Sequence, residues 1–277
     1  NMFNDKILAG LMNWYLISGL DETTGEEAIN RFDTLDSEEI RIQDAECQPQ
    51  VLKKELQSKY MNDNNDEIKK TSIEPGVEAA TKLALGAQTV EQLIAQLQQF
   101  DGCALKRTAT NLVFIDGNIE APLLFIGEAP GAEEDKSGQP FVGPSGKLLD
   151  AILESVGLDR TKVLISNTVF WRPPGNRTPT LLETAVCLPF IQRLIELVCP
   201  KIIVTLGGPA AKSLLNQPDG VSRIRGQWFD YKTPNLKQKI PTLVMFHPAY
   251  LLRSPYQKRL AWHDIRAIAR RLEQITN

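Results

Sequence analysis

The sequence predicts an α/β fold, a three-layer α/β/α sandwich around a central, mostly parallel four-stranded sheet. After Cys103, short apolar runs alternate with longer amphipathic stretches, which is the pattern of strands joined by helices. Before it, from about residue 33 to 76, the chain is acidic, Asn-rich and poor in periodic apolar residues. We therefore expect a helical and partly disordered N-terminal extension over residues 1–88 and an α/β domain over residues 89–277.

Short apolar runs after residue 103 are the expected strands. Each is bounded by glycine, proline or polar residues, as buried strands are. The four runs are 122–127, 163–167, 201–207 and 242–247. Because parallel strands bind ligands at their carboxyl ends, we expect a site there.

Helices are expected before and between these strands. Thr180 and Glu183 have the spacing of a capping box, which predicts a helix over 180–198. The other expected helices are 7–16, one beginning near Thr89, 145–156, 209–215 and a basic one from about residue 255.

Composition restricts the class of protein. The chain has 277 residues, of which 42% are hydrophobic and 23% charged, as in proteins with a substantial core. No run approaches the roughly 20 apolar residues of a membrane span, and the start lacks a signal-peptide pattern. We expect a cytoplasmic monomer without a membrane partner.

Charge differs between the two parts of the chain. Residues 1–100 contain 9 Lys/Arg and 18 Asp/Glu, a net charge of −9, and residues 101–277 contain 22 and 16, a net charge of +6. Only the second part is suited to a phosphate backbone. A protein partner of the acidic extension is left open.

Two nucleotide-binding motifs are incomplete. Residues 143–147 read Gly-Pro-Ser-Gly-Lys, but Phe141 stands where a P-loop begins with glycine, and Leu148 replaces the Ser/Thr that holds magnesium. Residues 127–131 lack the spacing of a dinucleotide-binding loop. An NTPase or a dehydrogenase is therefore disfavoured.

Four segments at the expected strand ends together resemble the uracil-DNA glycosylase superfamily, specifically its family 4 branch. They are 127–135, 138–143, Asn167 with 172–177, and 247–253. The resemblance runs from about residue 103 to the C-terminus. It implies an enzyme that flips uracil out of DNA and hydrolyses its N-glycosidic bond, leaving an abasic site, as the first step of base excision repair. No lysine in these segments offers a Schiff-base nucleophile, so a lyase step is not expected.

Three residues match the family's uracil pocket. Phe141 matches the aromatic that stacks on the base, and Asn167 matches the amide that reads the uracil edge. Gly127 precedes the first motif's carboxylate in the same pocket. From the residues alone, Phe141 could instead belong to the core, and Asn167 could cap a turn.

Three further residues match catalytic positions of the family. The resemblance implies that Glu128 positions water and stabilises the cationic sugar, and that His247 donates to the uracil oxygen that gains charge. Glu134 matches a carboxylate at the pocket. The alternatives are a helix N-terminal carboxylate for Glu128, a structural histidine, and a solvated acidic loop around Glu134.

DNA contacts are expected beside the last motif. Leu251 would be the apolar wedge that fills the vacated stack, unless it packs under the terminal helix. Basic residues of this region and of the Pro-Gly loop are phosphate candidates: Arg253, Lys258, Arg259, Arg172 and Arg177.

The cysteines depart from the family pattern. Family 4 members bind a [4Fe–4S] cluster through four cysteines, of which Cys103 and Cys187 are kept, whereas Phe100 and Trp171 stand at the other two positions. We expect no cluster and no other metal, with the aromatic side chains filling the volume.

Two other functions remain open. One is a related glycosylase for another deaminated base, such as hypoxanthine or xanthine. The other is a uracil-DNA binding protein without turnover.

Overall fold

The structure is a computed structural model that describes residues 66–276, with side chains described over 76–275. The helix expected at 7–16, most of the expected extension and the N-terminal part of the expected linker lie outside the described residues. Within them, no helix is long and apolar enough to cross a membrane.

In the described residues, six strands form one sheet in the order β1-β3-β2-β4-β6-β5. Their bounds are β1 Ile115–Gly117, β2 Leu123–Gly127, β3 Val163–Asn167, β4 Ile202–Leu206, β5 Trp228–Tyr231 and β6 Ile240–Met245. The inner four are parallel, as the sequence predicts, and β1 and β5 add antiparallel edges. These edges were not predicted, because three and four residues that are mostly half-buried give no apolar run.

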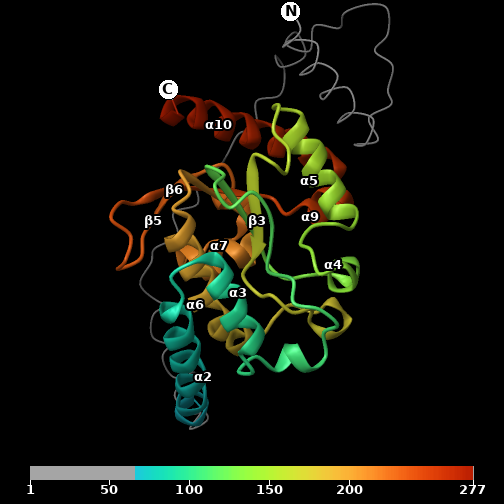
Figure 1. Ribbon diagram of the computed structural model, residues 1–277. Coiled ribbons are helices and arrows are strands. Elements are labelled where there is room, and N and C mark those ends of the chain that lie inside the picture. The colour runs from blue at the N-terminus through green and yellow to red at the C-terminus, as the bar shows by residue number, and fades with distance from the viewer. Residues whose placement is uncertain (1–65, 277) are drawn as a thin grey trace, which may run out of the picture. The chain divides into compact units, whose positions relative to one another are not determined.

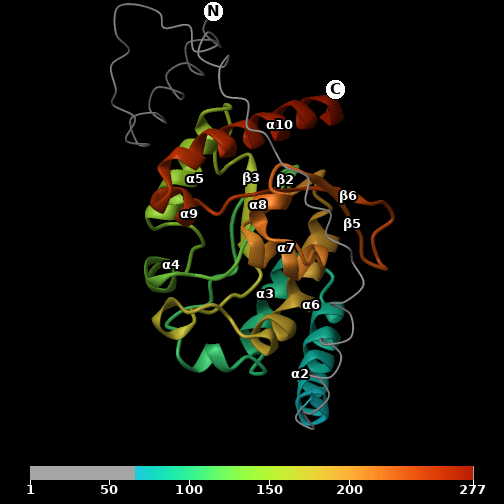
Figure 2. The ribbon, with the colours of Figure 1, turned by 180° about the vertical axis from the view of Figure 1, so that it is seen from behind.

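Alternate side chains of the central strands enter two separate cores. Leu124 and Ile126 belong to a core with helices α3 (Val90–Gln99) and α6 (Leu181–Val198), which we call the α6-side core. Leu123 and Phe125 belong to a core with α5 (Pro144–Glu154) and α10 (Lys258–Thr276), the α5-side core. Figures 1 and 2 show α5 with α10 on one side of the sheet and α3 with α6 on the other. The three-layer prediction is therefore confirmed.

Capping residues begin two helices where the sequence predicts. Thr89 Oγ1 accepts a hydrogen bond from the amide of Gln92 at 3.2 Å, and Thr180 and Glu183 form the capping box of α6. The remaining helices are α2 Asp66–Gly86, α4 Ala132–Ser137, α7 Gly208–Leu215, α8 Val221–Ile224 and α9 Pro248–Arg253. Short 3₁₀ turns span Ala104–Arg107, Pro174–Asn176 and Pro255–Gln257.

The end of α2 belongs to the α/β domain. Ala80, Ala84 and Ala87 are fully buried in the α6-side core. The Arg193 guanidinium donates two hydrogen bonds to the Ala87 carbonyl, at 3.0 and 2.8 Å. The boundary expected at residue 88 therefore falls inside a packed segment, and residues 66–76 of the expected linker are helical.

Candidate active site

A cavity of about 560 Å³ lies at the carboxyl ends of the parallel strands. The chain leaves β2 for β3 on one side and β4 lies on the other, so this end is the switch point where α/β sheets bind ligands. Predicted residues from all four strand ends line it: Glu128, Asn167, Gly207 and His247, with Phe141 from the loop before α5.

Gly127 allows two of these side chains to meet. It pairs with Asn167 in the register of β2 and β3. A Cβ at this position would overlap Asn167 Oδ1 and would lie 2.6 Å from Cζ of Phe141. Only glycine therefore fits between the amide and the ring.

Asn167 is held in the cavity with an unused acceptor. Its side chain is 1% exposed, and Oδ1 is buried with no hydrogen-bond partner among the residues that the structure describes. An unpaired buried acceptor of this kind costs about 1–3 kcal/mol. A ligand that donates to Oδ1 recovers that free energy.

Phe141 lies against His247 in an unusual backbone conformation. Its φ is 55°, in the left-handed region that non-glycine residues rarely adopt. The ring is 5% exposed, and its centroid lies 5.5 Å from that of the His247 ring, with 32° between the planes. The surrounding structure must therefore hold this loop in place.

Glu134 is one of the residues that hold it. Its Oε1 accepts hydrogen bonds from the amides of Val142 and Gly143, at 3.0 and 2.9 Å, and Oε2 accepts from the Gly131 amide at 3.1 Å. The carboxylate also lines the cavity. Its contacts are those of a residue that shapes two loops, rather than of a solvated acidic loop.

Glu128 follows β2 and is half-buried at the cavity. Its carbonyl accepts hydrogen bonds from the Thr168 hydroxyl at 2.9 Å and the Val169 amide at 3.0 Å, which fixes the backbone beyond the sheet. Burial raises the pKa of its carboxyl group above the ordinary value.

His247 is a neutral hydrogen-bond donor. Burial, with Arg253 nearby, lowers its pKa to about 4, although Glu134 acts in the opposite direction. Its Nδ1 accepts a hydrogen bond from the Ala249 amide at 3.1 Å. In a neutral imidazole the proton is then on Nε2, which makes Nε2 a donor.

Four of the basic residues expected at DNA have side chains at or near the surface. Arg253 and Arg177 line the cavity, and Arg259 is exposed. Arg172 donates a hydrogen bond to Asn176 Oδ1 at 2.7 Å. The Arg177 guanidinium also pairs with the Glu183 carboxylate at 2.7 and 2.8 Å.

Two residues expected to contact DNA are buried in the structure. Leu251 is fully buried in the α5-side core, where it packs with α10 residues, so it cannot enter a base stack in this conformation. Lys258 is only 2% exposed at the start of α10. Leu252, the next residue after Leu251, is 39% exposed.

Sequence reasoning missed several lining residues. Tyr250, Asn176 and Ser145 line the cavity, and Tyr250 and Asn176 lie within the quoted motifs. For Tyr250 and Asn176, the only sequence signal was their position within a motif, because a single tyrosine or asparagine does not by itself indicate a binding site.

These observations define an α/β protein with a cavity lined by an aromatic ring, an amide, an imidazole and carboxylates at the switch point of its sheet. A family model described as the uracil DNA glycosylase superfamily matches residues 114–266. The chain belongs to this superfamily.

Several relatives are named Type-4 uracil-DNA glycosylase. The protein of Thermotoga maritima is 39% identical over 181 residues, 64% of this chain and 92% of the relative. That of Archaeoglobus fulgidus is 36% identical over 185 residues, 65% of this chain and 92% of the relative. That of Sulfurisphaera tokodaii is 35% identical over 185 residues, 65% of this chain and 83% of the relative.

The residues at the family's cluster positions do not fit a [4Fe–4S] cluster. Phe100 and Trp171 are 3% and 2% exposed and share the α6-side core with Cys103 and Cys187. The Phe100 ring centroid lies 5.1 Å from that of Phe190. A cluster needs four thiolates, and this volume offers two thiols and two packed rings.

The two thiols interact with each other. A hydrogen bond with Cys187 lowers the pKa of Cys103, while burial raises the pKa of Cys187 well above its ordinary value. In the part of the chain that the structure describes, no three His, Cys, Asp or Glu side chains group as metal ligands.

Proposed function

We propose that the chain is a monofunctional uracil-DNA glycosylase, which flips uracil into the cavity and hydrolyses its N-glycosidic bond. The observation that carries the proposal is the buried, unpaired Asn167 Oδ1 beside Phe141 and the neutral His247, in one cavity. The activity in the relatives' names supports it. The abasic product assigns the enzyme to the first step of base excision repair.

Recognition follows from the donor and acceptor pattern of the base. Uracil presents an N3–H donor between two carbonyl acceptors. Asn167 Oδ1 accepts from N3–H and its amide nitrogen donates to the neighbouring carbonyl, while Phe141 stacks on the ring. Cytosine has an acceptor at N3 and an amino group beside it, so it leaves Oδ1 unpaired.

Bond cleavage separates charge between the sugar and the base. The Glu128 carboxylate stabilises the cationic sugar and orients the water that attacks C1′. His247 donates from Nε2 to the uracil oxygen that becomes negative. The water supplies the hydroxyl that bonds to C1′ and the proton that finally resides on the released uracil.

We assign DNA contacts to side chains that are exposed or that line the cavity. Arg253, Arg177, Arg172 and Arg259 would hold phosphates around the cavity mouth. Leu252, which is exposed on α9 between the cavity-lining residues Tyr250 and Arg253, is the apolar side chain suited to enter the vacated stack.

Base release from an end-labelled oligonucleotide with one uracil tests the function. Wild type should yield alkali-cleavable abasic product in EDTA-containing buffer without magnesium. Asn167→Ala should lose activity on the order of 100-fold, the size of two hydrogen bonds of about 1.4 kcal/mol each. Tight uracil-DNA binding by well-folded wild type without any release would instead identify a binding protein.

We also propose that the enzyme holds no iron–sulfur cluster. Iron and acid-labile sulfide in the purified protein should be absent, and the visible spectrum should show no cluster band. The variant Phe100→Cys/Trp171→Cys restores four thiols and provides a comparison reconstituted in the same way. Stoichiometric iron and sulfide in wild type would contradict the proposal.

A further inference from the structure

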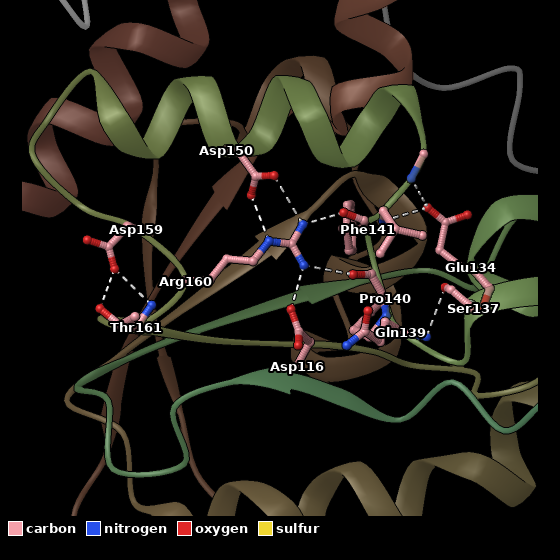
Figure 3. A network of polar contacts seen from close by, with 12 residues as sticks. Asp116, Glu134, Ser137, Gln139, Pro140, Phe141, Asp150, Asp159, Arg160 and Thr161 are labelled. Atoms are coloured by element: carbon pink, nitrogen blue, oxygen red, sulfur yellow. Dashed lines mark hydrogen bonds and ion pairs between the residues drawn. The ribbon is translucent and has the colours of Figure 1, made fainter.

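The loop that carries Phe141 is fixed from two sides by ionised side chains (Figure 3). On one side, Glu134 accepts from the amides of Val142 and Gly143. On the other, the Arg160 guanidinium donates to the carbonyls of Pro140, at 3.2 Å, and Phe141. Each of the four consecutive residues 140–143 thus has a backbone polar group held by a charge.

Arg160 comes from a distant part of the chain. It lies in the turn between α5 and β3, where no expected site residue stands. Its Nε donates to Asp150 on α5 at 2.8 Å, and its Nη1 donates to Asp116 on β1 at 2.5 Å. The two carboxylates orient the guanidinium so that its remaining donors meet the loop.

The charge of this group is maintained despite its partial burial. The Arg160 side chain is 26% exposed. Burial alone would lower its pKa, but the hydrogen bonds with Asp150 and Asp116 raise it above the ordinary value. The guanidinium therefore stays ionised over the whole working range of an enzyme.

The Phe141 carbonyl is confined on a further side. A Cβ at Gly146, in the first turn of α5, would collide with this oxygen. The left-handed Phe141 backbone is unfavourable by itself, so it needs such restraints. Without Arg160, the carbonyls of Pro140 and Phe141 lose their charged donor and the ring is free to leave its place beside His247.

We infer that Arg160 is a positioning residue for uracil excision, which holds Phe141 through its backbone so that the ring is in place before the base enters. Asp116 and Asp150 act through Arg160. The inference rests on the proposed function, because Phe141 is taken as the surface on which uracil stacks. Arg160 itself is assigned no contact with the base.

A double-mutant cycle distinguishes positioning from general stability. Arg160→Gln should lower the single-turnover rate of uracil release on the order of 10- to 100-fold, while the affinity for uracil-free DNA changes less than twofold. In a Phe141→Ala background, Arg160→Gln should change the rate less than twofold, because the ring on which it acts is gone. Arg160→Lys, which keeps the charge without the planar fork, should recover part of the rate.

Arg193→Gln is a matched control. Arg193 is also a partly buried arginine that donates to a backbone carbonyl and pairs with a carboxylate, Glu196, but it lies in the α6-side layer away from the cavity. Its loss should lower the melting temperature without changing the rate of uracil release by more than twofold.

Hydrogen exchange of the segment 138–147 gives a readout that does not need activity. Exchange should be faster in Arg160→Gln than in wild type and unchanged in Arg193→Gln. Equal rate losses in the wild-type and Phe141→Ala backgrounds, or unchanged exchange of this segment, would overturn the inference. Wild type that releases no uracil, with exchange still faster in Arg160→Gln, would refute the proposed function but leave the hold on the loop standing.

Discussion

At the residue scale, the proposed recognition of uracil depends on two polar atoms that have no hydrogen-bond partner among the described residues. Asn167 Oδ1 is buried and unpaired, and His247 Nδ1 is already used by the Ala249 amide, which leaves Nε2–H for a ligand. These assignments give the site one acceptor and one donor with fixed identities. A base that cannot donate to Oδ1 leaves it unsatisfied, and this is the physical basis of selectivity.

Gly127→Ala should abolish uracil release with a smaller effect on folding. The added methyl group would overlap the Asn167 amide and the Phe141 ring, so both recognition groups must move. We expect at least a 100-fold lower single-turnover rate and a destabilisation of about 1–3 kcal/mol in urea unfolding. Gly86→Ala, where a Cβ meets nothing within 4 Å, should leave the rate unchanged. A Gly127→Ala enzyme with wild-type rate would refute the packing assigned to this position.

The acid limb of the pH–rate profile should belong to Glu128. Burial raises its pKa, and only the ionised carboxylate stabilises the cationic sugar, so activity should rise with pH through an ionisation above 4.5. His247, with a pKa of about 4, is already neutral there. Glu128→Gln should therefore show a low rate without this limb.

His247→Gln should keep the limb while the rate falls on the order of 100- to 1,000-fold, as for loss of an oxyanion donor. Single-turnover rates between pH 4.5 and 8 provide the measurement. A limb that persists in Glu128→Gln and disappears in His247→Gln would reverse the two roles.

At the element scale, the short helix α9 decides which of two adjacent leucines is buried and which is exposed. Its six residues begin at the His247 cap and turn Leu251 into the α5-side core and Leu252 outward. Two adjacent leucines give no sequence signal for which one faces solvent, and only the direction of the helix settles it.

Substitution of each leucine should have opposite effects. Leu251→Ala should destabilise the protein by about 2–5 kcal/mol because it opens a cavity in the core. Leu252→Ala should leave stability within about 0.5 kcal/mol of wild type. It should also slow uracil release from double-stranded DNA more than from single-stranded DNA, where no stack needs filling. Urea unfolding and rates on both substrates test this, and the reverse pattern would restore Leu251 as the wedge.

The longer elements were predictable because their signals are local. Capping by Thr89 and Thr180, and the apolar runs of the inner strands, act within a few residues. The strand-end residues Glu128, Asn167 and His247 followed from the rule that parallel strands end together. Arg160 could not be found in this way, because its partners Asp116 and Asp150 are close only in the folded chain.

At the whole-molecule scale, aromatic side chains are packed at two positions where the family resemblance implies cluster cysteines. The α6-side core joins α3, α6 and the end of α2, and the two aromatic substitutions Phe100 and Trp171 lie inside it. Cys103 and Cys187 remain there as small buried side chains. The strands that carry the active site rest on this core from one side.

Phe100→Ala should therefore destabilise the whole domain. Removal of a buried ring that packs at a tilt against Phe190 should lower the free energy of unfolding by about 3–5 kcal/mol. Incubation with an iron chelator should leave the unfolding of wild type unchanged. A wild-type protein that loses stability on chelation would show that metal, and not the ring, holds this region.

Release from a panel of oligonucleotides that differ only in the target base tests the central claim most directly. Uracil, cytosine, hypoxanthine and xanthine would be compared under single-turnover conditions in EDTA. We predict release of uracil and a cytosine rate that is lower by orders of magnitude, because cytosine has no N3–H to donate to Asn167 Oδ1. Hypoxanthine and xanthine also present an N–H beside a carbonyl, so their rates test whether the cavity admits a bicyclic ring. Release of cytosine as fast as uracil, or of no base at all by folded enzyme, would contradict the recognition assigned to Asn167.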